Sequence, residues 1–160
     1  MVLLTQIVCV LVLLAITVQD IREKKVYLGL LLCSGFFMSY LYLVNTQLLT
    51  YFTNLSINLL VLLLIFGVLF FYVKLKLKRP LLSVLGSGDL FFFLIIAISF
   101  PVTTFVILFS FSLFFASVIF RVLPQKTNNN YVPLAGLQAL FLALVLSSNW
   151  LFQFVNLYAL

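Results

Sequence analysis

Two aspartates are the residues with which this chain could do chemistry. The sequence holds three acidic residues and no histidine, which excludes every mechanism built on a Ser-His or Cys-His pair. Any chemistry must therefore use carboxylates, lysines, hydroxyls or thiols. Asp20 follows a long apolar run, and Asp89 lies in Gly86-Ser87-Gly88-Asp89 between two further apolar runs. A carboxyl group at membrane depth is costly, and its presence there indicates a function.

If the two carboxyl groups meet in a poorly solvated place, they cannot easily both ionise, and we expect them to share a proton. One carboxylate could then act as a general base that activates a water against a peptide carbonyl, while the other group acts as the general acid. This chemistry needs neither a metal ion nor a cofactor, and we expect none. Because the pair would titrate as a unit, the proton is assigned to neither aspartate.

The residues beside Asp89 suggest how a substrate could lie there. Gly86 and Gly88 have no Cβ, so they permit positive φ angles and let another backbone approach closely. An extended substrate strand could then pair with the backbone of this loop, as in strand addition. We therefore expect Gly86, Ser87 and Gly88 to be substrate-binding residues.

Composition places the chain in a membrane. The sequence is 66% hydrophobic and 8% charged, whereas a soluble domain has roughly 25% charged residues. We therefore predict a polytopic membrane protein with the lipid bilayer as its surroundings. The net charge of +6 is not read as a nucleic-acid surface, because the basic residues occur in clusters between apolar runs. Cys9 and Cys33 lie inside apolar runs, and no CxxC pair is present to bind zinc.

The apolar runs predict an all-α integral membrane protein with six transmembrane helices in a single domain, residues 1–160. A span needs about 20 apolar residues. The fourth run is long enough only if the Gly-rich stretch lies inside it, so we expect either a late helix start or an irregular Gly-rich break before or within the fourth helix. The expected spans are about 2–19, 26–44, 55–73, 80–100, 102–123 and 132–155.

With six spans, all the basic residues fall on one face. They form three clusters, which are Arg22, Lys24 and Lys25; Lys74, Lys76, Lys78 and Arg79; and Arg121 and Lys126. The positive-inside rule makes this face cytoplasmic, so the N-terminus and the C-terminus are expected outside. Asp20 and Asp89 then lie at the cytoplasmic ends of the first and fourth helices, and they could meet if these two helices pack together.

Each aspartate also has a structural interpretation. Asp89 could be a helix N-cap, because Asp and Ser are favoured at that position. Asp20 could be an interfacial charge that pairs with Arg22 or Lys24. Since two of only three acidic residues end apolar runs at the same expected face, we favour a catalytic pair over two unrelated structural charges.

The stretch Gly86-Ser87-Gly88-Asp89 resembles the GxGD motif of the intramembrane aspartyl proteases. The whole chain looks like the type IV prepilin peptidase and preflagellin peptidase family. In that family a first catalytic aspartate closes the first core helix before a basic loop, as Asp20 does here, and the second is the aspartate of GxGD, matched by Asp89. A weaker similarity is Tyr131-Val132-Pro133-Leu134-Ala135-Gly136, which is like the proline-containing start of the last helix of the family. Phe91 stands where many members carry lysine.

The resemblance implies a membrane aspartyl endopeptidase that removes the leader peptide from prepilin-like proteins of type IV pilus or secretion systems. The site would face the cytoplasm, and the enzyme would be a multi-pass protein of the inner (cytoplasmic) membrane. The N-terminal methyltransferase region of the long members, with its cysteine pairs, is not in this sequence, so N-methylation is not implied. The alternative is a non-catalytic scaffold or a small transporter subunit, in which a broken fourth helix would form the binding site. The oligomeric state is left open.

Overall fold

The computed structural model describes residues 2–78, 86–122 and 133–159, and every regular element in these ranges is helical. The prediction of an all-α chain is confirmed for this part. The elements are α1 (Val2–Glu23), α2 (Leu28–Val44), α3 (Leu48–Tyr72) with the short π-helical continuation η1 (Val73–Leu77), α4 (Ser87–Ser99), α5 (Val102–Val122) and α6 (Leu134–Phe152).

Four of these helices are long and apolar enough to cross a membrane, namely α1, α3 together with most of η1, α5 and α6. The other two are apolar but shorter, with 17 residues in α2 and 13 in α4. At about 1.5 Å per residue, α4 is about 20 Å long, whereas the hydrocarbon core of a bilayer is about 30 Å thick. The chain therefore has the apolar helices of a membrane protein, but its described helices are unequal in length.

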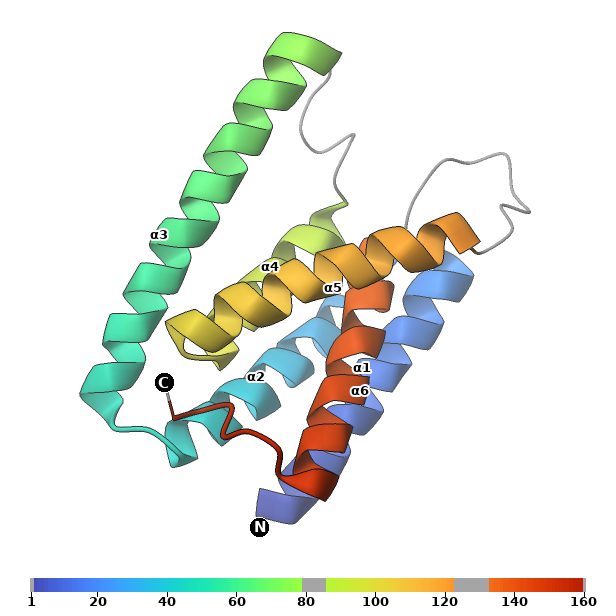
Figure 1. Cartoon of the computed structure of the whole chain (residues 1–160). Helices are drawn as coiled ribbons and strands as arrows, with labels where there is room; N and C mark the ends of the chain where they lie inside the picture. The colour runs from blue at the N-terminus through green and yellow to red at the C-terminus, as the bar shows by residue number, and fades with distance from the viewer. Residues whose placement is uncertain (1, 79–85, 123–132, 160) are drawn as a thin grey trace.

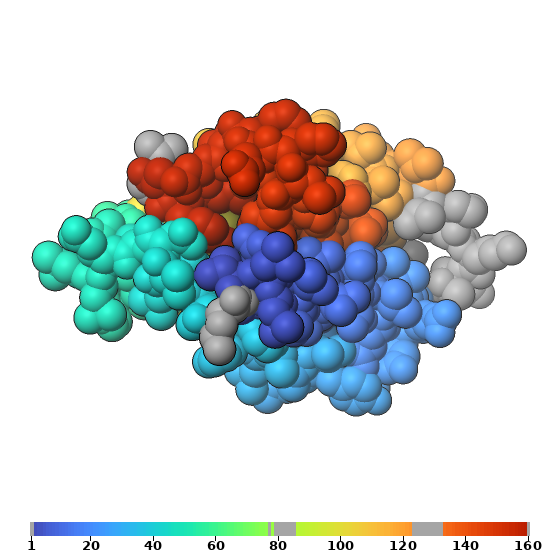
Figure 2. Space-filling view, turned by 90° about the horizontal axis from the view of Figure 1, so that it is seen from below, coloured from blue at the N-terminus to red at the C-terminus, as the bar shows by residue number. Residues whose placement is uncertain are grey.

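The helices form a bundle in which α1 packs against α6 and α2, α4 packs mainly against α2, and α5 packs against α6 (Figure 1). The core lies between these helices. The longest helix, α3, leans away from the others and is mostly exposed along its length. Seen from the end that carries the N-terminus, the start of α1 lies between α6 and α2, and α3 stands to one side (Figure 2).

The pairing of α4 with α2 depends on a small residue. A Cβ atom added to Gly35 of α2 would lie 3.3 Å from Cγ1 of Ile95 on α4, so glycine lets the two helices approach closely. The sequence raised the possibility that the first and fourth helices pack on each other. In the structure their main partners are α6 and α2 instead, and the two helices are linked through these neighbours.

The stretch that precedes the third apolar run is helical over most of its length. The run begins near Leu55, but α3 begins at Leu48. Two hydroxyl groups in the first half of α3 bond inside the helix, because Thr53 donates to the Leu49 carbonyl at 2.9 Å and Ser56 donates to the Phe52 carbonyl at 2.9 Å. Polar residues that bond back to the preceding turn can lie in a helix without a loop.

Asn58 joins α3 to the end of α4. Its side chain is fully buried, and its Nδ2 atom donates to the carbonyl oxygens of Ala97 and Phe100 at 2.7 and 2.8 Å. These carbonyls belong to the C-terminal end of α4, where no further helical turn provides donors. A side chain from a neighbouring helix therefore caps α4.

We predict that Asn58→Leu lowers the free energy of unfolding by about 1–3 kcal/mol, because two buried carbonyl groups lose their donor. The measurement is thermal unfolding of the purified chain in detergent. Ser56→Ala is the matched control, since Ser56 is exposed and bonds only within its own helix. Equal melting temperatures for Asn58→Leu and Ser56→Ala would contradict the capping role.

Candidate active site

Asp20 lies near the end of α1 on the face that packs against the core. The buried residues of α1 are Cys9, Leu13, Ile16, Thr17 and Asp20. Their spacing of three and four residues places them on one stripe of the helix. The side chain of Asp20 is only 6% exposed, and its Oδ2 atom accepts a hydrogen bond from the backbone N–H of Gly136 at 2.6 Å. The carboxyl group is thus held against the first turn of α6.

Asp89 is the third residue of α4 and is partly buried. Its Oδ1 atom accepts a hydrogen bond from the backbone N–H of Ala135 at 2.8 Å, and its Oδ2 atom accepts one from the N–H of Gly86 at 3.2 Å. The second bond is the carboxylate half of a capping box, in which the third helical residue reaches back to the N-cap. Gly86, rather than Asp89, is therefore the N-cap residue of α4.

The two carboxyl groups converge on adjacent amides. Ala135 and Gly136 are consecutive residues, and consecutive Cα atoms are about 3.8 Å apart, so the bound oxygens of Asp20 and Asp89 lie within about 9 Å of each other. The two groups also interact electrostatically. Residues that are far apart in sequence are thus brought to one place, by the start of α6 rather than by direct packing of α1 on α4.

The start of α6 is suited to hold negative charge. The first amides of a helix have no acceptor inside the helix, and the helix dipole is positive at this end. Pro133, the N-cap of α6, provides no side-chain hydrogen bond. Asp89 and Asp20 supply the missing acceptors to Ala135 and Gly136 from two other helices. Burial and mutual repulsion disfavour two charges here, whereas the amides favour negative charge.

Gly136, like Ala135, is a site residue to which the sequence assigned no role. A Cβ atom at this position would lie 2.8 Å from Cβ and 2.9 Å from Oδ2 of Asp20, which is closer than real contacts allow. Its carbonyl oxygen also faces α1, because the Thr17 hydroxyl donates to it at 3.1 Å. The sequence signal that could have pointed to Gly136 is the stretch Pro133–Gly136, which is similar to the start of the last helix in the prepilin peptidase family. Tyr131 and Val132, the rest of that stretch, lie outside the described residues.

The predicted substrate-binding residues form the regular start of α4. Gly86 has φ −64° and ψ 148°, the helix begins at Ser87, and no described glycine has a positive φ angle. Of the two alternatives for the fourth helix, the described residues have the late start, and the irregular break is not found at Gly86–Gly88. Residues 80–85 of the expected span lie outside the described part.

Glycine at position 86 nevertheless has a local reason. A Cβ atom there would lie 3.2 Å from Oδ2 of Asp89, so glycine permits the close approach of the carboxylate to the Gly86 amide. Gly86 and Ser87 are exposed, whereas Gly88 is half-buried near Val26. The start of α4 thus leaves Gly86 and Ser87 exposed beside the partly buried Asp89.

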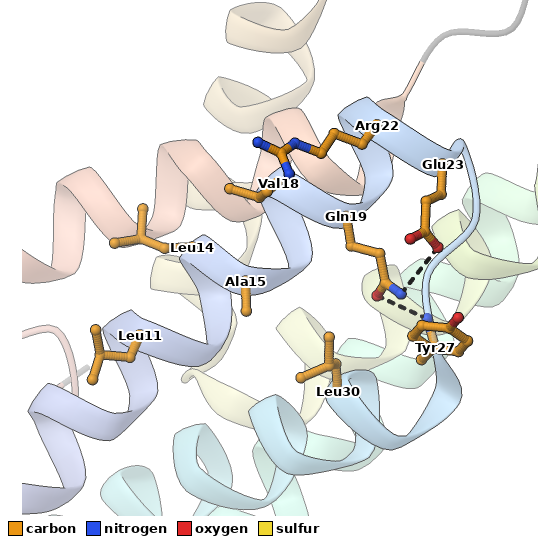
Figure 3. A pocket seen from close by; sticks show the side chains of 9 residues that line it. All are labelled: Leu11, Leu14, Ala15, Val18, Gln19, Arg22, Glu23, Tyr27 and Leu30. Atoms are coloured by element: carbon orange, nitrogen blue, oxygen red, sulfur yellow. Dashed lines mark hydrogen bonds between the residues drawn. The ribbon is translucent and has the colours of Figure 1, made fainter.

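A shallow groove of about 630 Å³ lies between α1 and α2, but not on the side of the aspartates (Figure 3). It is lined by Leu11, Leu14, Ala15, Val18, Gln19, Arg22, Glu23, Tyr27 and Leu30. The groove residues of α1 occupy the sequence positions between the buried residues of the stripe that includes Asp20. The groove therefore lies on the opposite face of the helix from Asp20. Gln19 bonds to Glu23 and to the Tyr27 amide there, which holds the turn after α1.

Nothing in the described ranges resembles a metal centre, because no three His, Cys, Asp or Glu side chains gather in them. The candidate site therefore consists of Asp20 and Asp89, the two amides that hold them, and the exposed start of α4. Comparison of the chain with protein-family models, with characterised proteins and with solved structures finds no match.

Proposed function

We propose that this chain is a membrane aspartyl endopeptidase that removes the leader peptide from prepilin-like proteins. The observation that carries the proposal is the convergence of Asp20 and Asp89 on the adjacent amides of Ala135 and Gly136. Two carboxyl groups in one poorly solvated site are the chemical equipment of an acid–base hydrolase that uses neither histidine nor a metal ion. The GxGD resemblance of Gly86–Asp89 supports the same assignment.

In the proposed reaction the aspartates share one proton. The ionised carboxylate takes a proton from a water molecule, and the water oxygen bonds to the carbonyl carbon of the scissile peptide. The protonated carboxyl gives its proton to the carbonyl oxygen. The tetrahedral intermediate then collapses: one of its hydroxyl groups returns its proton to the ionised carboxylate as the carbonyl re-forms, the carbon–nitrogen bond breaks, and the departing amine takes a proton from the other carboxyl group. The pair again holds one proton. The two amides of α6 fix the carboxyl groups beforehand, so little reorganisation accompanies the reaction.

The substrate is proposed to approach along the membrane. A prepilin-like protein has an apolar stem that stays in the bilayer, so its leader junction is held at the membrane face. This restriction raises the effective concentration of the scissile bond near the aspartates. The C-terminal ends of α1, α3 and α5 lie at the same end of the molecule as the start of α6 (Figure 1). These ends carry basic residues: Arg22 on α1, Lys74 and Lys76 on η1 after α3, and Arg121 on α5. By the positive-inside rule, this end faces the cytoplasm of the inner membrane.

The test is cleavage of a purified prepilin-like protein by the purified chain, with both in liposomes. We expect one cut at the leader junction, identified by the masses of the two products. We also expect the rate to be unchanged by EDTA, because the chemistry relies on carboxyl groups. If a panel of prepilin-like substrates stays intact under conditions in which the chain remains folded, the proposed activity is wrong.

A further inference from the structure

We propose that Thr17 is a positioning residue of the aspartate pair, which fixes the height of α6 along α1 so that the Gly136 amide meets Asp20. This inference rests on the proposed function. Thr17 is 5% exposed, and its Oγ1 atom lies 2.9 Å from the Leu13 carbonyl oxygen and 3.1 Å from the Gly136 carbonyl oxygen. The hydroxyl has one proton, which these two carbonyl oxygens share: the first contact is within α1, whereas the second reaches α6.

The geometry of Gly136 gives this contact its importance. Both backbone groups of Gly136 face α1, since its N–H donates to Asp20 and its C=O accepts from Thr17. Thr17 and Asp20 are three residues apart, so they lie on the same face of α1 in neighbouring turns. Because these two contacts lie at different heights along α1, together they prevent α6 from sliding along α1, which one contact alone would not do. The absence of a side chain on Gly136 brings the backbones close enough for both.

The Gly136 carbonyl oxygen has a hydrogen-bond donor even without the Thr17 hydroxyl group. Within a helix the Gly136 carbonyl also accepts from the amide four residues later. Removing the Thr17 hydroxyl therefore leaves no buried group without a partner, and the fold can tolerate the change. The expected loss is one of alignment: the Gly136 amide, and the Asp20 carboxyl that it holds, are no longer fixed along the axis of α1.

The experiment compares Thr17→Val with Thr17→Ser in the liposome cleavage assay. Valine has nearly the shape of threonine without the hydroxyl, and we expect kcat to fall roughly 3- to 30-fold with little change in KM. Serine keeps the donor, so we expect kcat within about 2-fold of the parent. Thr53→Val is the matched control, because Thr53 bonds only to the Leu49 carbonyl of its own helix, and its kcat should be unchanged.

A second measurement does not depend on cleavage. Hydrogen–deuterium exchange of the amides at the start of α6 should become faster in Thr17→Val and stay as in the parent in Thr53→Val. If Thr17→Val keeps the parent kcat, or if only KM changes, the positioning role is wrong. If the parent does not cleave, the proposed function fails, and faster exchange in Thr17→Val would then reveal a structural contact alone. The two failures are therefore distinguishable.

Discussion

Replacing Asp20 by asparagine is expected to reduce leader cleavage at least about 100-fold while the chain stays folded. The asparagine oxygen can still accept the Gly136 N–H that now bonds to Oδ2 of Asp20. An amide, however, neither takes a proton from water nor shares one with Asp89. The same reasoning applies to Asp89→Asn, although there one of the two backbone bonds, to Ala135 or Gly86, is lost as well. Cleavage rate and melting temperature are the two measurements.

This prediction separates a catalytic pair from a structural one. In a non-catalytic scaffold the aspartates would serve as caps for α6, so Asp20→Asn would behave like the parent and Asp20→Ala would be less stable. In a peptidase, both variants are inactive, and only the alanine variant is clearly destabilised. Glu23→Gln is the control, because Glu23 is the other acidic residue of α1 and is exposed. Cleavage by Asp20→Asn at the parent rate would exclude the aspartyl mechanism.

Gly136→Ala is expected to lower the free energy of unfolding by about 1–3 kcal/mol and to reduce cleavage at least about 10-fold. The added Cβ would lie 2.8 Å from Cβ of Asp20. Both Cβ atoms are attached directly to helix backbone, so neither atom can move away unless its helix moves. The start of α6 must therefore move away from α1, and the bond between Asp20 and the Gly136 amide lengthens or breaks. Melting temperature and cleavage rate are measured in the same preparation.

Gly67→Ala provides the matched control for this change. Gly67 also lies within a helix, but a Cβ there meets nothing within 4 Å. Alanine is favoured over glycine inside helices by roughly 0.5–1 kcal/mol, so Gly67→Ala should be as stable as the parent or more stable. If the two glycine variants have the same stability and activity, the close contact between Gly136 and Asp20 has no consequence, and the account of the site is wrong.

The sequence predicted the fold class and singled out Asp20 and Asp89, but it did not predict which groups bring these two aspartates together. Composition predicted an all-helical chain with membrane-length apolar helices, because the apolar content exceeds what a soluble fold can bury. Counting spans placed Asp20 and Asp89 at the same expected face, and we expected them to meet only if the first and fourth helices packed together, which they do not. Their common partner could not be predicted, since a backbone amide is present at every residue except proline and no side-chain pattern marks the amides of Ala135 and Gly136.

The start of α4 illustrates a second limit. The glycines of Gly86–Gly88 suggested positive φ angles, but glycine is also accepted at a helix N-cap, and the helix simply begins there. Composition alone does not distinguish these outcomes. Likewise, the third span was expected to begin at residue 55, whereas α3 begins at Leu48 and Thr53 bonds to the Leu49 carbonyl within it. In both places local hydrogen bonding decided the structure.

The role of α6 has a consequence for the order of biosynthesis. The amides that hold Asp20 and Asp89 come from Ala135 and Gly136, which the ribosome adds long after both acids. Until the last helix docks, α1 and α4 carry two carboxyl groups without the amides that align them. The nascent chain therefore lacks an aligned pair until α6 has been made. On the proposed function, cleavage begins only after α6 has docked, so the candidate site forms later than the helices that carry its acids.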